Sequence, residues 1–345
     1  MALVLHSDLP AFETMREEGV ELRLPSEAAT SALPDISIGL LNLMPDAALR
    51  ATDRQFIRLV AGSADEFDLW VYPFTVAVES RGEEAVRHVA DHYATFADVA
   101  GAGIDALIVT GANPAHHELE RESFWPELGE VLDWARESTG SVLCSCLATH
   151  AVLQRYRGMV RARLPQKRWG LYSHRQVRNH PLLDGLREIV EAPHSHWYDV
   201  TRAEMESVGL TVLLESDEAG VHMAVDDDEF YVFFQGHPEY DPVSLLKEYR
   251  RELGRWYRGE RDGYPPMPEN YFDDIAMKTL EAYRPLLEAA RAEGSQPPRL
   301  SEADLLPKHP HTWTGDGQTI YRNWLRRVVQ GRRMGSDFTH RVARD

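Results

Sequence analysis

Two cysteines, one histidine and one glutamate have the types and positions that nucleophilic catalysis requires. Cys144 and Cys146 are the only 2 cysteines in the 345-residue chain, and both lie in the stretch LCSCLATHAVL. A disulfide between them is disfavoured, because residues i and i+2 of a strand lie too far apart for bridge geometry. A structural zinc site is also disfavoured, because such sites use a second ligand pair and no further cysteine exists. The cysteines are therefore either small buried side chains or part of a reactive site.

Cys146 is expected at the junction between a short strand, SVLC, and a helix, ATHAVLQRY. A sharp turn of this kind, the nucleophile elbow, exposes its central residue and needs small residues two positions before and after it. Cys144 and Ala148 meet that requirement. The helix N-terminus favours a thiolate and offers backbone N–H groups to an oxyanion. We therefore predict Cys146 as the nucleophile, Cys144 as a packing residue behind it, and the N–H groups of Leu147 and Ala112 as the oxyanion hole.

A base for this thiol is offered by His237, which follows the apolar stretch FYVFF. Glu239 comes two residues later, so its carboxylate can orient the imidazole and stabilise the imidazolium. A histidine in such a turn can also be a packing residue. The combination of a nucleophile, a base and a carboxylate at strand ends favours a catalytic triad of Cys146, His237 and Glu239.

Alternating strand and helix patterns must position these residues. Continuous apolar runs predict strands, and apolar residues recurring at threes and fours predict helices. The predicted elements are strand Ile36–Met44, helix Ala47–Leu59, strand Phe67–Phe74, helix Glu83–Val99, strand Ile104–Thr110, helix Trp125–Arg136, strand Ser141–Ser145 and helix Ala148–Tyr156. This alternation implies an α/β fold with a mostly parallel sheet, helices on both faces and an active site at the carboxyl ends of the strands. We expect a single domain over residues 1–345, with its α/β core at 35–258 and extensions at 1–34 and 259–345.

Composition argues against several classes of function. A net charge of −18 disfavours nucleic-acid binding, which requires a basic surface. The basic run NWLRRVVQGRRMG (323–335) is typical of the basic end of a helix. No apolar run approaches the roughly 18 residues of a membrane span, and the start of the chain has no secretory pattern. We expect a cytoplasmic protein that does not bind membranes.

The histidine pairs have no metal-site signature. The pairs at 116–117, 194–196 and 309–311 all lack the H-E-x-x-H spacing of a helical zinc site. The acidic stretch DDDE (226–229) lies between apolar runs and is typical of a hairpin turn, because a calcium loop needs alternating ligands and a glycine. We therefore expect no metal in the active site.

Several short motifs occur together along the chain. They are LNLMP (41–45), RQFIRL, LIVTGA (107–112), FWPEL, APHS (192–195), GHPEYD (236–241), and NYF and NWL near the end. In this combination the chain resembles the homoserine O-acyltransferases of the MetA type, from about Leu9 to about Asp337. The resemblance implies a flavodoxin-like, doubly wound core of the class I glutamine amidotransferase type, and a homodimer.

The resemblance also implies a ping-pong acyl transfer in methionine biosynthesis, with acyl-CoA as co-substrate and no bound cofactor. The Cys146 thiolate would take the acyl group from acyl-CoA, and the hydroxyl of L-homoserine, deprotonated by His237, would then receive it. The family's substrate contacts fall on Lys167 in KRWGLY, Ser195 in APHS, and Arg251. The planar guanidinium of Arg251 suits the carboxylate of an amino acid.

The sequence departs from the family pattern in three places. Asp-Ala-Ala follows LNLMP at 46–48, where the family usually has lysines, and Leu147 follows the cysteine where an aromatic residue is common. The family's acyl-specificity position, a glutamate with acetyl-CoA and a glycine with succinyl-CoA, falls on Ala115. A small uncharged side chain leaves room for the longer acid and does not repel its carboxylate, so succinyl-CoA is favoured over acetyl-CoA.

Other functions remain open. A glutamine-hydrolysing amidotransferase would use the same triad, but it would need a synthetase partner or domain, for which the chain has no room. A catalytically silent binding protein would not need all three triad residues. The acceptor could also be L-serine, because a difference of one methylene is usually resolved by only about 1–3 kcal/mol.

Overall fold

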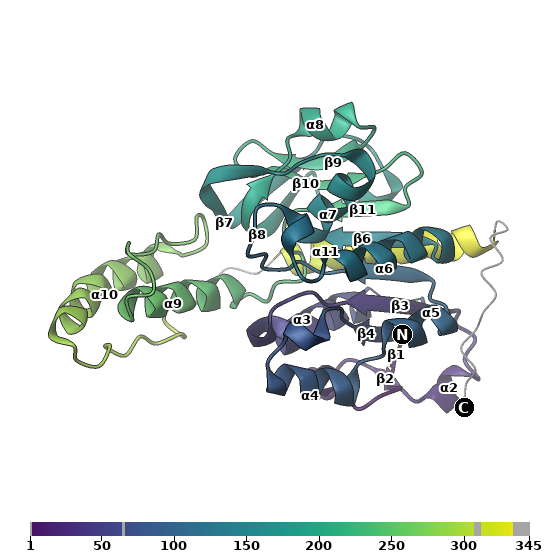
Figure 1. The fold of residues 1–345 in the computed structure, drawn as a ribbon, viewed down its shortest axis with the longest axis horizontal. Helices are drawn as coiled ribbons and strands as arrows, with labels where there is room; N and C mark the ends of the chain where they lie inside the picture. The colour runs from purple at the N-terminus through teal and green to yellow at the C-terminus, as the bar shows by residue number, and fades with distance from the viewer. Residues whose placement is uncertain (1, 64–65, 307–311, 334–345) are drawn as a thin grey trace.

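The computed structural model describes residues 2–63, 66–306 and 312–333, in which a large sheet lies between two layers of helices (Figure 1). The 11 strands of the sheet follow the order β2-β1-β4-β3-β5-β6-β11-β10-β9-β7-β8. Its parallel part comprises β2 (Leu22–Arg23), β1 (Ala2–Val4), β4 (Asp68–Phe74), β3 (Asp35–Leu41), β5 (Ala106–Val109), β6 (Ser141–Ser145) and β11 (Tyr231–Phe234). The predicted α/β fold with a mostly parallel sheet is confirmed.

The strand order places a crevice between β3 and β5. The central strands run β4-β3-β5-β6-β11, which is the 2-1-3-4-5 order of flavodoxin-like sheets. After β3 the chain goes to β4 on one side, whereas β5 pairs with the other side of β3. The carboxyl ends of β3 and β5 therefore form the topological switch point, where doubly wound proteins bind ligands. Because β6 lies next to β5 and ends at Ser145, Cys146 follows at the same edge.

Helices cover both faces because successive strand residues point to opposite sides of the sheet. Ile38 and Leu40 of β3 pack with Phe56 and Trp324 on one face, and Leu41 packs on the other. The first face is covered by α1 (Pro10–Glu17), α3 (Asp46–Ala61) and α11 (Trp313–Arg333), and the second by α5 (Phe96–Ala102), α6 (Trp125–Ser138) and α7 (Leu147–Arg157).

The remaining part of the sheet is antiparallel. It comprises β10 (Gly220–Val225), β9 (Thr211–Ser216), β7 (Ala162–Gln176) and β8 (Ile189–Asp199), and β10 pairs with β11. The hairpin turn predicted at 226–229 joins β10 to β11, and Asp226 Oδ1 accepts a hydrogen bond from Tyr231 N at 2.8 Å. This half of the sheet carries the predicted substrate contacts Lys167 and Ser195.

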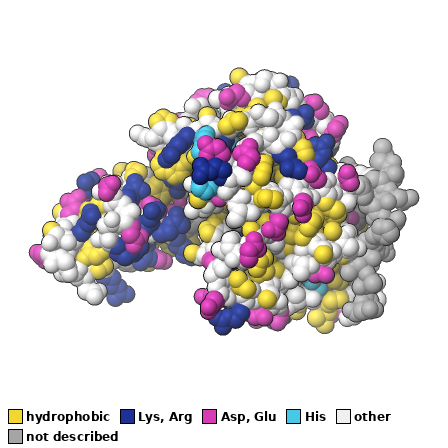
Figure 2. All heavy atoms as spheres, viewed as in Figure 1, with side chains coloured by type: hydrophobic (Ala, Val, Ile, Leu, Met, Phe, Trp, Pro, Cys, Tyr) yellow, Lys and Arg dark blue, Asp and Glu magenta, His cyan; other side chains and the backbone are white. Residues whose placement is uncertain are grey.

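An arm of two helices, α9 (Ser244–Tyr257) and α10 (Asp274–Glu293), extends away from the sheet at the left of Figure 1. Its own apolar cluster includes Tyr249, Trp256 and Leu280. Figure 2 shows Lys and Arg side chains interspersed with Asp and Glu over this arm. The short elements are α2 (Pro25–Ala28), η1 (Val78–Ser80), α4 (Glu83–His92), η2 (Leu119–Arg121), η3 (Pro181–Leu183) and α8 (Arg202–Ser207). Among the described residues, no helix has the length and apolarity that crossing a membrane requires.

The prediction of one helix over Glu83–Val99 is wrong. The structure divides this segment into α4 and α5, because Thr95 begins a new helix as a capping box. Asp98 N donates to Thr95 Oγ1 at 3.1 Å, and Thr95 N donates to Asp98 Oδ2 at 3.0 Å. The T-x-x-D spacing is visible in the sequence and marks this helix start. The other predicted elements are present, with ends that differ by a few residues.

Candidate active site

Cys146 occupies a strained turn between β6 and α7. Its backbone has φ +50° and ψ −102°, and a residue held in such a sparsely populated region costs about 1–3 kcal/mol. Hydrogen bonds to β11 hold the turn: Cys146 N donates to Phe234 O at 2.7 Å, and Thr149 Oγ1 donates to the same oxygen at 3.1 Å. Cys144 and Ala148 are buried on either side of it. The predicted elbow, with its small flanking residues, is present.

His237 follows β11 and is held at both its backbone and its ring. Its N–H donates to Pro193 O at 2.7 Å. Its Nδ1 lies 2.7 Å from Glu239 Oε1, and both side chains are buried. Tyr240 stacks on the imidazole with ring centroids 4.4 Å apart. Because Glu239 Oε2 has no hydrogen-bond partner among the described residues, the imidazole is the side-chain partner of this carboxylate.

Charges oppose burial in setting the protonation of His237. Burial by itself would lower the pKa of this imidazole. The charge of Glu239 and the hydrogen bond with Cys146 act in the opposite direction and raise the pKa of His237 to about 10. The imidazolium is therefore the stable form at neutral pH. The structure brings Cys146, His237 and Glu239 together in the order that a nucleophile, a base and an orienting carboxylate require.

The loop after β5 lies against Cys146 and opens into a cavity. A Cβ atom added to Gly111 would lie 3.6 Å from Cys146 Cβ. The next residue, Ala112, lines a cavity of about 430 Å³, whose wall also includes the segments 43–47 after β3 and 76–81 after β4. Leu147, the other predicted oxyanion residue, begins α7, so its N–H has no acceptor inside the helix. Leu147 thus follows Cys146 directly, and Ala112 lies one residue beyond the glycine that packs against Cys146.

An arginine in the wall of this cavity is paired with Asp46. Arg81 Nη1 donates to Met44 O at 3.0 Å and to Asp46 Oδ1 at 3.1 Å. Its Nη2 donates to Thr75 Oγ1 at 2.9 Å. Asp46, which departs from the family pattern, is therefore paired with a cation from another segment.

Two of the predicted substrate contacts meet at Glu248. Lys167 Nζ lies 3.0 Å from Glu248 Oε2, and Ser195 Oγ donates to the same oxygen at 2.7 Å. Tyr240 OH donates to Glu248 Oε1 at 2.8 Å, which links this group to the ring of His237. Burial would raise the pKa of Glu248, but the charge of Lys167 and the hydrogen bonds lower it. Glu248 was not predicted from the sequence, since an isolated glutamate in a helix has no local signal.

Arg251 and Ala115 lie outside this group. The Arg251 side chain is 61% exposed on α9, and its Nε lies 3.5 Å from Glu252 Oε1. Ala115 is exposed in the loop between β5 and α6. The next residue, His116, donates its N–H to Glu122 Oε1 at 2.5 Å, so the loop is anchored beside Ala115. The roles assigned to Arg251 and Ala115 stay predictions.

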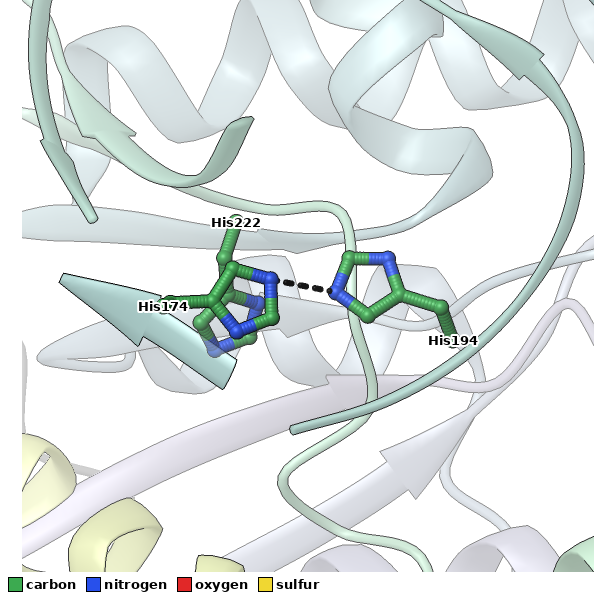
Figure 3. A group of neighbouring side chains, drawn as sticks. All are labelled: His174, His194 and His222. Atoms are coloured by element: carbon green, nitrogen blue, oxygen red, sulfur yellow. Dashed lines mark hydrogen bonds between the residues drawn. The ribbon is translucent and has the colours of Figure 1, made fainter. Parts of the chain in front are cut away.

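Three buried histidines meet beside the turn that carries His237, one each from β7, β8 and β10 (Figure 3). They are His174, His194 and His222, and each offers a ring nitrogen within 4.8 Å of the others. His174 Nε2 and His194 Nε2 share a hydrogen bond of 3.1 Å, and His222 Nδ1 accepts from Gly236 N at 3.2 Å. Burial lowers the pKa of all three, so they are neutral.

The three histidines could hold a transition metal only by giving up these hydrogen bonds. In a neutral pair, the ring that accepts at Nε2 carries its proton on Nδ1 and has no free lone pair. Ligation through either nitrogen of His222 would likewise remove the lone pair that accepts from Gly236 N. In the structure, His174 and His194 instead hydrogen-bond to each other, and His222 holds the backbone of Gly236 in the turn before His237. The sequence had paired His194 with His196, and the pair at 309–311 lies outside the described residues.

Fold and site together define a class of protein. It is an α/β protein with a flavodoxin-like strand order, a cysteine elbow after β6 and a His-Glu pair after β11, as the resemblance noted in the sequence implied. A solved glutamine amidotransferase from Thermotoga maritima is similar to this chain at 13% identity with a TM-score of 0.43, covering 87% of this chain and 100% of that one.

Sequence comparisons narrow this class to one family. The family described as homoserine O-succinyltransferase matches residues 2–333. Homoserine O-succinyltransferases of Methylobacter tundripaludum and Methylococcus capsulatus are each 46% identical over 332 residues, covering 96% of this chain and 94% of theirs. That of Thiothrix nivea is 47% identical over 332 residues, covering 96% of this chain and 92% of its own. The chain belongs to the homoserine O-succinyltransferase family and is an acyltransferase.

Proposed function

We propose that this acyltransferase moves a succinyl group from succinyl-CoA to the hydroxyl of L-homoserine through a thioester on Cys146, as a step in methionine biosynthesis. Membership of the family supports the acyl group and the acceptor. The observation that carries the covalent mechanism is the buried His237, held by Glu239 at 2.7 Å, with a pKa that Glu239 and Cys146 together raise.

In the first half-reaction the Cys146 thiolate attacks the carbonyl carbon of the acyl-CoA thioester. The oxyanion that forms would accept hydrogen bonds from the N–H groups of Leu147 and Ala112. When the bond to the CoA sulfur breaks, the His237 imidazolium gives its proton to the departing thiolate. The products are free CoA, a succinyl thioester on Cys146 and a neutral imidazole.

In the second half-reaction the neutral His237 accepts the proton of the homoserine hydroxyl. The oxygen attacks the thioester, Cys146 leaves as a thiolate, and the thiolate and imidazolium are restored. Glu239 stabilises the cation each time it forms. Lys167 and Ser195, held together by Glu248 beside His237, are the groups that we assign to the acceptor.

The cavity at the switch point is the place we assign to the donor. It lies at the carboxyl ends of β3 and β5 and includes Ala112 in its wall, next to the residue packed against Cys146. The small side chain of Ala115 supports succinyl over acetyl as the acyl group.

Intact-protein mass spectrometry with succinyl-CoA or acetyl-CoA, in the absence of acceptor, tests the proposal. We expect a succinyl adduct on the wild type and on Cys144→Ala, no adduct on Cys146→Ala, and loss of the adduct when L-homoserine is added. L-Serine in place of homoserine tests the acceptor. Absence of any adduct on reduced protein, together with hydrolysis of glutamine, would instead establish an amidotransferase.

A further inference from the structure

Arg161 is a buried cation whose partners are mainly backbone carbonyls. It immediately precedes β7 and is 3% exposed. Its Nη2 donates to His116 O at 2.9 Å and to His117 O at 3.0 Å, and its Nε donates to His117 O at 3.3 Å. Nη1 makes no hydrogen bond to the described part of the chain and is not sealed from solvent. No carboxylate in that part lies within ion-pair distance of this guanidinium, so one of its N–H₂ groups is available.

A buried cation without a counter-ion is costly, and carbonyl dipoles compensate it only in part. Burial accordingly lowers the pKa of Arg161, while Tyr198, Cys146 and Glu122 act in the opposite direction. The guanidinium is therefore within electrostatic range of the nucleophile. Two other cations near the site differ in this respect, because Lys167 is paired with a glutamate and Arg81 with an aspartate.

Arg161 is hydrogen-bonded to the loop that carries Ala115, the predicted acyl-specificity position. The two carbonyls that it binds belong to the residues directly after Ala115. Its guanidinium carbon lies 3.8 Å from the centroid of the Tyr198 ring, and the ring of His117 lies 5.3 Å from the same ring. The planar group is thus fixed between β8 and this loop.

We propose that Arg161 binds the terminal carboxylate of a dicarboxylic acyl group on the donor, and that this contact selects succinyl over acyl groups without a carboxylate. The anion supplies a counter-charge within ion-pair distance, which no described carboxylate does, and a guanidinium is suited to a carboxylate by its planar N–H groups. An acetyl group leaves Arg161 without this partner. The proposal rests on the proposed function and deepens it by naming the residue that recognises the acyl end.

Single-turnover formation of the acyl-enzyme, followed by intact mass, tests this role with three donors: succinyl-CoA, butyryl-CoA and acetyl-CoA. Butyryl has the same chain length as succinyl without the carboxylate. In Arg161→Gln we expect the rate at subsaturating succinyl-CoA to fall about 10- to 100-fold, the size of a hydrogen bond to a charged group. Acetyl and butyryl transfer should change by less than about threefold, because neither uses the contact.

Two further variants separate recognition from loop structure. Arg161→Lys keeps the positive charge but loses the planar pair of N–H donors, so we expect an intermediate loss of acylation rate, and only with succinyl-CoA. The matched control is Arg163→Gln, because Arg163 is an exposed arginine of β7 whose guanidinium carbon lies 5.3 Å from the centroid of the Trp197 ring. This variant should leave all three rates unchanged. Free succinate should also slow acylation of the wild type more than butyrate does, and this difference should disappear in Arg161→Gln.

The outcomes are distinguishable. Equal losses with all three donors in Arg161→Gln and Arg161→Lys would assign Arg161 to the loop or to the thiolate, and would overturn the proposal while leaving the acyltransferase mechanism intact. An unchanged rate with succinyl-CoA would overturn it as well. Failure of the wild type to form any acyl-enzyme would refute the proposed function, and the role of Arg161 with it.

Discussion

Replacing Glu239 with glutamine should lower the pKa of His237 while keeping the shape of the site. The carboxylate lies 2.7 Å from Nδ1, and its charge is a main cause of the pKa of about 10. Glutamine keeps an acceptor oxygen but removes the charge. A hydrogen bond to a charged group contributes about 1.5–3 kcal/mol, and the buried pair is only weakly screened. Since 1.36 kcal/mol corresponds to one pH unit, the titration of His237 should move to lower pH by roughly one to two pH units.

NMR of histidine-labelled protein measures this titration directly, with the signal of His237 assigned from its absence in His237→Asn. The sign follows from the raised pKa: the wild-type imidazolium persists to about pH 10, and the variant loses it at lower pH. The alkaline decline in the rate of acyl-enzyme formation should move to lower pH in parallel. A matched control is Glu215→Gln, which removes a carboxylate paired with Arg202 at 3.1 Å on β9. An unchanged midpoint in Glu239→Gln would refute the role assigned to this carboxylate.

Two further predictions concern the support of the site. Gly236→Ala should destabilise the fold by about 1–3 kcal/mol, because the added Cβ would lie 2.7 Å from His194 Nε2 and from His222 Nδ1. Thermal unfolding measures the loss, and Gly263→Ala, whose added Cβ meets nothing within 4 Å, should show none of this steric penalty. Glu248→Leu should slow transfer to homoserine by about 10-fold or more and succinylation of the enzyme much less, because Lys167 and Ser195 bond to Glu248 directly, whereas His237 contacts it only through the ring of Tyr240. Quenched-flow mass spectrometry separates the two half-reactions, and equal slowing of both would contradict this assignment.

The elements around the nucleophile were predictable because their signals are local. The apolar run of β6, the small residues around Cys146 and the start of α7 lie within a few residues of one another. The wrong prediction of one helix over Glu83–Val99 also came from a local signal, the helical spacing of apolar residues. Helical spacing continues through the segment, but the capping box at Thr95 ends one helix and begins another. A test for capping boxes within long periodic segments corrects this kind of error.

The supporting residues could not be predicted, because each acquires its role from distant segments. Glu248 of α9 receives a proton donor from β8 and a lysine from β7. Arg161 is defined by the carbonyls of a loop more than forty positions earlier in the chain. The three histidines come from three strands with no spacing pattern between them.

The sequence by itself determined the alternation of strands and helices, the cysteine elbow and the His-Glu pair, because these depend on side-chain periodicity and on near neighbours. Only the tertiary structure decided that His237 lies near Cys146, that Lys167 and Ser195 converge on one carboxylate while Arg251 remains exposed, and that Arg161 is buried with no described carboxylate at ion-pair distance. The physical reason is that burial and charge pairing depend on which distant segments the sheet order brings together, and these set the protonation and the free hydrogen-bonding capacity of each group.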